Sequence, residues 1–117
     1  FFNSPMIHKF RAFVTGSYAY GVPKKDSEVD VVIFLTEKDL DRLLANKDNS
    51  HSEYFNYITA GGTPLRFGRL NLICCTNERK YEVWLQGTQR LKKQAPVTRE
   101  YAIEFMRKLR VKAGFNL

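Results

Sequence analysis

The sequence predicts an α/β (α+β) domain built on a small mixed β-sheet, with helices packed mainly on one face. Its 117 residues suit a single domain spanning 1–117, because a chain of this length leaves no room for a second core. Hydrophobic residues make up 44% of the chain, which is enough for a compact interior. Short apolar runs typical of strands alternate with segments of helical periodicity. Residues 1–5 are set aside as a cloning remnant or the tail of something longer.

The first half of the chain predicts two strands joined by a turn-rich loop. Residues 10–15 form a short apolar-rich strand that runs into Gly16. Residues 21–27 contain a glycine, a proline and the polar run Lys-Lys-Asp-Ser, which together favour a turn. Residues 29–35 are rich in β-branched side chains, as expected for a central strand that is buried on both faces.

A helix is predicted directly after the second strand. Thr36 suits the N-cap, and Asp39 stands three residues later in the manner of a capping box. The helix ends near residues 46–48. Its apolar face consists of Leu40, Leu43 and Leu44.

The stretch from residue 47 to residue 75 predicts one further strand. Residues 54–58 suggest a short helix, and the glycines and proline of residues 61–64 predict a break. Residues 65–75 then have the character of a strand, with Gly68 as a turn or bulge within it.

Two helices complete the predicted domain. Asn77 caps a helix over about residues 78–93, and Pro96 breaks it. Thr98 caps a last helix, which ends at Gly114. The side chains predicted to face the core are Tyr81, Trp84, Leu85, Thr88 and Leu91 in the first helix, and Ala102, Phe105, Met106 and Leu109 in the second.

Cysteine usage and hydropathy predict a cytoplasmic protein with no membrane segment. Cys74 and Cys75 are neighbours in a predicted strand, so their side chains point to opposite faces and cannot pair. We interpret both as reduced packing residues. No window approaches 18 consecutive apolar residues. The net charge of +7 suits a polyanionic partner such as a nucleoside triphosphate, a nucleic acid or an acidic protein, and it suits equally a soluble protein in which lysines happen to predominate.

Residues 16–21, Gly-Ser-Tyr-Ala-Tyr-Gly, follow directly on the first strand. Gly16 lets the backbone turn sharply and come close to a ligand. Free backbone N–H groups and the Ser17 hydroxyl can then bind phosphate oxygens. A Gly-Ser pair alone is most often a plain turn, so its meaning depends on the carboxylates that follow.

Glu28 and Asp30 stand two residues apart at the start of the second strand, so their side chains share one face, about 7 Å apart at Cα. Two carboxylates on one face repel each other unless a cation lies between them. Carboxylate and phosphate oxygens are the hard ligands that Mg²⁺ prefers. On its own such a pair is most often made of solvated residues at the entry to a strand, but next to the Gly-Ser turn it predicts a magnesium site.

Taken together, residues 16–21, Pro23 and residues 26–31 resemble the signature of the nucleotidyltransferase superfamily related to DNA polymerase β. That signature is Gly-Ser, a short spacer, and Asp/Glu-x-Asp flanked by apolar residues. The resemblance is strongest over residues 10–35, and it is closest to the minimal bacterial and phage members. It implies Mg²⁺-dependent transfer of a nucleoside monophosphate from a triphosphate to an acceptor, with release of pyrophosphate.

The resemblance also assigns residues. Gly16 and Ser17 would bind the nucleoside triphosphate, while Glu28 and Asp30 would hold the metal and serve in catalysis. The sequence departs mildly from the family in that the first acid is glutamate, where aspartate is commoner. The second departure is larger. The family usually has a third carboxylate on a later strand, and the matching position here is Asn71, which is expected to complete the catalytic set.

Asn71 leaves the question of turnover open. Its amide offers a neutral carbonyl oxygen, which does not offset the charge of a second ion, and no Asp or Glu occurs between Tyr54 and Asn77 to replace it. Either the protein is an enzyme with a weaker second metal, or it binds nucleotide without turnover. A third interpretation is that Asn71 is a strand residue with no functional role.

Several basic residues are further candidates. Lys24 and Lys25 lie in the loop between the two halves of the motif and are expected to bind nucleotide phosphate, although solvated lysines are common in such loops. Arg66 and Arg69 flank Gly68, where they can contact a triphosphate or an acidic acceptor, or simply be exposed strand-edge charges.

Three functions follow from these residues. The first is a small magnesium-dependent nucleotidyltransferase whose acceptor is a protein, an RNA or a small molecule, with specificity supplied by a partner or second domain. The second is a degenerate member that binds nucleotide or a partner protein without turnover. The third is a basic nucleic-acid-binding domain that uses the arginines and lysines near its C-terminus.

Overall fold

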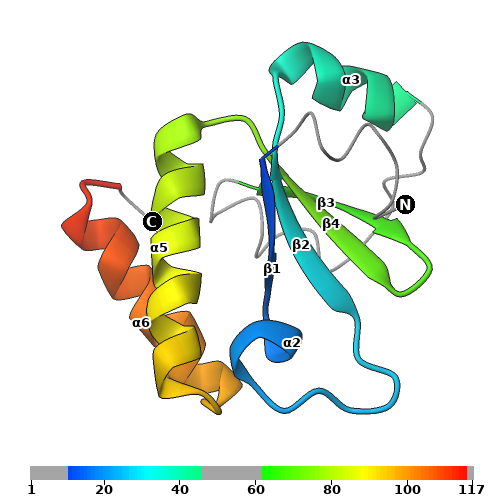
Figure 1. Cartoon of the computed structure of the whole chain (residues 1–117). Helices are drawn as coiled ribbons and strands as arrows, with labels where there is room; N and C mark the ends of the chain where they lie inside the picture. Colours follow the sequence, from blue (N-terminus) through cyan, green and yellow to red (C-terminus); the bar gives the residue numbers. More distant parts are fainter. Residues whose placement is uncertain (1–10, 46–61, 116–117) are drawn as a thin grey trace.

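The computed structural model describes residues 11–45 and 62–115, and this part of the chain is an α+β domain, as predicted (Figure 1). A mixed sheet has the spatial order β1-β2-β4-β3. The strands are β1 (Ala12–Thr15), β2 (Val29–Phe34), β3 (Gly62–Phe67) and β4 (Leu70–Cys75). The helices are α2 (Ser17–Tyr20), α3 (Glu37–Ala45), α5 (Glu78–Gln94) and α6 (Arg99–Lys112).

The central strand β2 pairs with β1 in the antiparallel sense and with β4 in the parallel sense. β3 then pairs with β4 as an antiparallel edge strand. In the parallel pair the same ends of two strands meet, so Asp30 near the start of β2 lies level with Asn71 near the start of β4. This register brings together residues that are far apart in the sequence.

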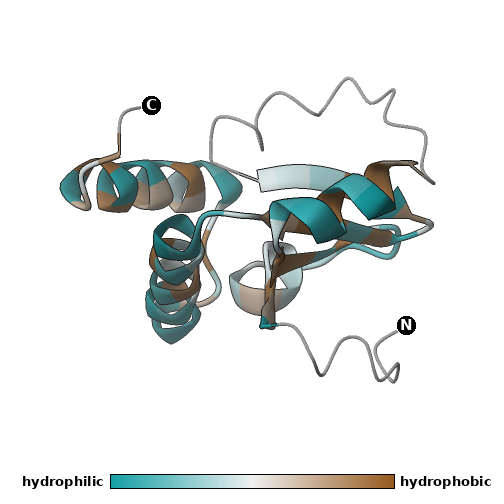
Figure 2. Ribbon diagram, turned by 90° about the horizontal axis from the view of Figure 1, so that it is seen from above, coloured by the Kyte–Doolittle hydropathy of each residue, from teal (hydrophilic) through white to brown (hydrophobic). Residues whose placement is uncertain are grey.

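Hydrophobic side chains fill both faces of the sheet. The larger helices α5 and α6 cover one face, around a cluster that includes Val32, Ile73 and Trp84. The other face carries a second cluster that includes Val31 and Leu72, against which the predicted leucines of α3 are packed. Figure 2 shows hydrophobic colour along part of the sheet and hydrophilic colour over much of α3 and α5. The helices therefore lie mainly on one face, with α3 on the other.

The predicted helix boundaries agree with the structure at their caps. The Thr36 hydroxyl accepts a hydrogen bond from the Asp39 amide at 3.2 Å, which is the N-cap half of a capping box, and it donates to the Asp39 carboxylate at 3.0 Å. Asn77 caps α5 and Thr98 caps α6 through their side-chain oxygens. Gly114 has φ 94° just beyond α6, as a helix-ending glycine requires.

The prediction of one strand over residues 65–75 was wrong, but the turn given as one alternative for Gly68 is present. Gly68 has φ 62° and sits in a tight turn that folds this segment into the hairpin β3–β4. The predicted break over residues 61–64 was also wrong from Gly62 onward, because β3 begins there. Pro64 is tolerated in β3 because the strand lies at the sheet edge.

The short helix suggested for residues 54–58 lies outside the described residues. Within the described ranges, the structure contains no helix with the length and apolar character needed to cross a membrane.

Candidate active site

A row of four residues crosses the sheet at one end. The strand registers place Thr15 opposite Asp30, Asp30 opposite Asn71, and Asn71 opposite Arg66. Residues paired in this way project their side chains from the same face of a sheet. The Thr15 hydroxyl lies 2.8 Å from the hydroxyl of Thr88 in α5, so the row belongs to the face that α5 covers.

Asp30 and Asn71 form the centre of this row. The Asn71 side-chain amide donates a hydrogen bond of 3.0 Å to Asp30 Oδ1. Asn71 is only 4% exposed, and this contact gives its buried amide a partner. The structure thus brings together two of the three residues predicted for catalysis, with a neutral amide against the carboxylate.

Gly16 presses against the same carboxylate. Its φ of 70° and ψ of −155° lie in a region that is essentially restricted to glycine. A Cβ added here would lie 2.3 Å from Asp30 Oδ2, too close for any side chain. The Gly-Ser turn and Asp30 are therefore packed directly together, as a joint phosphate and metal site requires.

Ser17 is the first residue of α2. The Gly16 carbonyl accepts hydrogen bonds from the amides of Ala19 at 2.9 Å and Tyr20 at 3.1 Å. The earlier amides, those of Ser17 and Tyr18, have no acceptor within this helix. Such N–H groups can bind an anion that approaches the turn.

Tyr20 is a site residue that the sequence analysis missed. Burial raises the pKa of its phenol, and the nearby Asp30 charge adds to this rise, while hydrogen bonds with Thr15 and the Gly16 backbone act to lower it. The Tyr20 carbonyl also accepts a 2.8 Å hydrogen bond from the Val97 amide, which ties α2 to the segment before α6. Tyr20 lies within the Gly-Ser segment, but nothing in the sequence distinguishes it from Tyr18.

Glu28 reaches the opposite end of the row. Its carboxylate forms an ion pair with the Arg66 guanidinium through Oε1 and Nη2. The Glu28 side chain is 26% exposed and that of Arg66 is 42% exposed, so the pair faces partly toward solvent. Arg66 was predicted only as a contact for a triphosphate or acidic acceptor, or as edge charge. Its partner here is one of the two predicted metal ligands.

Arg69 binds the loop that carries Glu28. Its guanidinium donates to the Tyr18 hydroxyl at 3.0 Å and to the carbonyls of Lys25 and Ser27, each at 3.1 Å. The Arg69 carbonyl accepts a 2.8 Å hydrogen bond from the Val29 amide. The β3–β4 turn therefore holds the connection between α2 and β2 in place.

Lys24 and Lys25, the predicted nucleotide-binding lysines, are exposed on this loop. The Lys24 amide donates to the Ser27 hydroxyl at 2.7 Å, and the Ser27 amide donates back to the Lys24 carbonyl at 3.0 Å. Within residues 11–45 and 62–115, neither lysine side chain has an ion pair. Both are thus placed on an ordered turn with their ammonium groups toward solvent.

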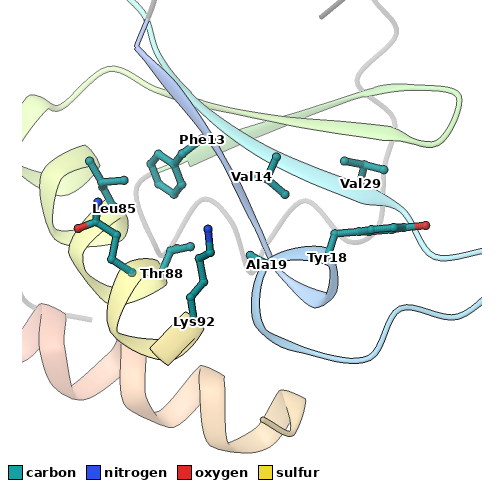
Figure 3. A pocket seen from close by; sticks show the side chains of 9 residues that line it. Phe13, Val14, Tyr18, Ala19, Val29, Leu85, Thr88 and Lys92 are labelled. Atoms are coloured by element: carbon teal, nitrogen blue, oxygen red, sulfur yellow. The ribbon is translucent and has the colours of Figure 1, made fainter. Parts of the chain in front are cut away.

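A pocket of about 570 Å³ opens beside β1, between α2 and α5. Figure 3 shows Leu85 and Lys92 of α5 on one side and Tyr18 near Val29 on the other. The pocket adjoins the Gly-Ser helix, but its lining includes none of the predicted catalytic residues.

The donor set fits one Mg²⁺ ion shared with phosphate. No group of three or more His, Cys, Asp or Glu side chains able to hold a metal occurs among the described residues. Mg²⁺ is commonly bound through one or two carboxylates plus substrate phosphates, with water filling the rest of its shell. Glu28 and Asp30, on the same end of the sheet as the Gly-Ser turn, match that pattern.

Comparison with known protein families finds that residues 2–60 match the family described as nucleotidyltransferase domain. The match covers about half of the chain and includes the Gly-Ser turn and both predicted metal ligands. No curated protein and no solved structure matches the chain significantly.

Proposed function

The chain belongs to the nucleotidyltransferase domain family, and on that premise we propose that it transfers a nucleoside monophosphate from a nucleoside triphosphate to an acceptor, with Mg²⁺ as cofactor. The observation that carries the proposal is the contact of Asp30 with both Gly16 and Asn71. It supports a site in which a carboxylate and a phosphate-binding turn serve the same ligand.

In this proposal the Ser17 hydroxyl and the first amides of α2 bind the triphosphate, aided by Lys24 and Lys25. Glu28 and Asp30 hold the metal, and Asn71 orients Asp30 through its amide. The bound cation would neutralise charge on the triphosphate and on the departing pyrophosphate. An acceptor oxygen bonds to the α-phosphorus as the bond to the β-phosphate breaks, and the acceptor proton is released.

The acceptor in this proposal is a protein, an RNA or a small molecule, and a partner protein or further domain supplies its specificity. We place the reaction in the cytoplasm because Cys74 and Cys75 are free, buried thiols, as is usual in reducing compartments.

Calorimetry with Mg²⁺ and a non-hydrolysable triphosphate tests the metal assignment. Asp30→Asn keeps the shape of the side chain but removes its charge, so we expect it to abolish Mg²⁺-dependent triphosphate binding. Asp26→Asn is the matched control, since Asp26 is an exposed carboxylate on the loop that leads into β2. If Asp30→Asn binds as the unaltered chain does, the metal assignment is wrong. Circular dichroism checks that both variants fold.

A second candidate function is nucleotide binding without turnover, which the neutral Asn71 amide beside Asp30 favours. Transfer of radiolabel from each α-labelled triphosphate to protein or RNA in lysate distinguishes the two functions. Label that appears with the unaltered chain supports the transferase. Label that appears only after Asn71→Asp supports the binding module, because the native site then lacks a necessary carboxylate.

A further inference from the structure

We propose that Arg66 is a built-in cation of the site, so that the site binds a single divalent metal ion and the guanidinium takes the place of a second. This inference rests on the proposed function. It adds a role for Arg66, to which the proposed function assigns none. Its basis is the position of Arg66 in the row across the sheet and its ion pair with Glu28.

The position of Arg66 is the first argument. Arg66 pairs with Asn71, which in turn pairs with Asp30, and the Arg66 guanidinium reaches Glu28 from the side of β3. Asn71 contributes no charge on that side. Among residues 11–45 and 62–115, the ion pair of Arg66 places a positive charge against Glu28 on that side.

The charge balance is the second argument. With Arg66 paired to Glu28, the carboxylates of Glu28 and Asp30 and the guanidinium together carry one net negative charge. A pair of divalent cations would turn this cluster strongly positive before the phosphates are counted. One divalent cation, counted on the same basis without the phosphates, leaves the cluster close to neutral, because Arg66 already offsets one of the two carboxylates.

The chemistry of arginine is the third argument. A guanidinium keeps its charge throughout the accessible pH range and has five N–H donors in a planar fork. One of these donors contacts Glu28 Oε1, which leaves others for phosphate oxygens. A carboxylate has two oxygens, so Glu28 can retain Arg66 on one and offer the other to the metal. The partial exposure of Arg66 allows a substrate to reach it.

Counting metal ions tests the proposal directly. The full chain is saturated with a non-hydrolysable triphosphate and dialysed to equilibrium against the same triphosphate and Mn²⁺, and bound Mn²⁺ is counted as the excess on the protein side, which excludes Mn²⁺ held by free triphosphate. We expect one bound Mn²⁺ per complex. Two would overturn the single-cation proposal while leaving the proposed function in place. A chain that binds neither triphosphate nor Mn²⁺ would overturn the proposed function itself.

Two variants then test whether Arg66 supplies the charge. Arg66→Gln should weaken binding of the triphosphate with Mn²⁺ by about tenfold or more, and Arg66→Lys should remain within about threefold, because it retains the charge. Arg107→Gln is the control, since Arg107 is an arginine of similar exposure that also pairs with a glutamate, Glu104, on α6. Unweakened binding by a folded Arg66→Gln variant would overturn the role of Arg66, as would equal losses for Arg66→Lys and Arg66→Gln.

Discussion

The backbone of Gly16 lies against the carboxylate of Asp30, so closely that a Cβ on residue 16 would stand 2.3 Å from Asp30 Oδ2. The two residues belong to different halves of the sequence motif, and the antiparallel pairing of β1 with β2 brings them together. Gly16 therefore allows the backbone conformation of the turn, and its lack of a side chain leaves room for the Asp30 carboxylate.

We expect Gly16→Ala to destabilise the protein by about 1–3 kcal/mol and to weaken triphosphate binding. The added methyl meets Asp30, and the backbone conformation of residue 16 is unfavourable for alanine. Urea denaturation and calorimetry measure the two effects. Gly68→Ala is the control, because Gly68 also has positive φ but has open space around the added Cβ. Equal losses of binding in the two variants would show that the Asp30 contact has no special role.

We expect Arg69→Met to loosen the loop between α2 and β2. Arg69 donates to Tyr18 and to two loop carbonyls, and removing these contacts should cost about 1–2 kcal/mol and expose the loop to proteases. The measurement is cleavage after Lys24 and Lys25 by a lysine-specific protease, followed by mass spectrometry without nucleotide.

The control for this experiment is Arg90→Met, because Arg90 is an exposed residue of α5. Its loop cleavage should match that of the unaltered chain. Cleavage of Arg69→Met at the unaltered rate would mean that other contacts are enough to hold the loop.

We expect Asn71→Asp to lower stability by about 1–3 kcal/mol without Mg²⁺ and to regain part of it when Mg²⁺ is added. The substitution removes the amide donor to Asp30 and sets two carboxylates face to face. Thermal melts with and without Mg²⁺ measure the effect. Asn77→Asp introduces the same charge at the N-cap of α5, where aspartate caps equally well, and should show neither loss nor rescue. Absence of Mg²⁺ rescue in Asn71→Asp would argue against a cation beside Asp30.

The family and the fold class could be predicted because short, contiguous segments of the sequence indicate them. The Gly-Ser turn, the Glu-x-Asp pair and the β-branched run of β2 are contiguous in the sequence, and residues 2–60 match the family. The helix caps at Thr36, Asn77 and Thr98 are equally local. The roles predicted for the individual site residues remain predictions.

Gly68 could be identified as a candidate turn, but the pairing of the hairpin strands and the arginine contacts could not be predicted, because they depend on strand register. The apolar run from residue 65 to residue 75 hides a two-residue turn, and only the left-handed conformation of Gly68 separates β3 from β4. Once the hairpin forms, Arg66 meets Glu28, which is 38 residues away in the sequence. A pattern read along the chain cannot select that partner among the other acidic residues.

The buried thiols and phenols should make the protein less stable in alkaline solution. Burial raises the pKa of Cys74 to about 12, and it also raises the pKa values of Cys75, Tyr20 and Tyr81. At neutral pH these groups are protonated in both the folded and the unfolded chain. Above the ordinary thiol pKa, near 9.0, the unfolded chain releases protons that the folded chain retains. Stability should therefore fall as pH rises from about 9 toward 12.

Urea denaturation midpoints over this alkaline range measure the effect. Cys74→Ala removes one of the groups with a raised pKa, so its midpoint should fall less steeply with pH than that of the unaltered chain, although the remaining groups still contribute. Each variant is compared with its own midpoint at neutral pH, because the lost packing of the Cys74 side chain lowers stability at every pH. The same slope in both proteins would show that Cys74 ionises as readily in the folded chain as in the unfolded one.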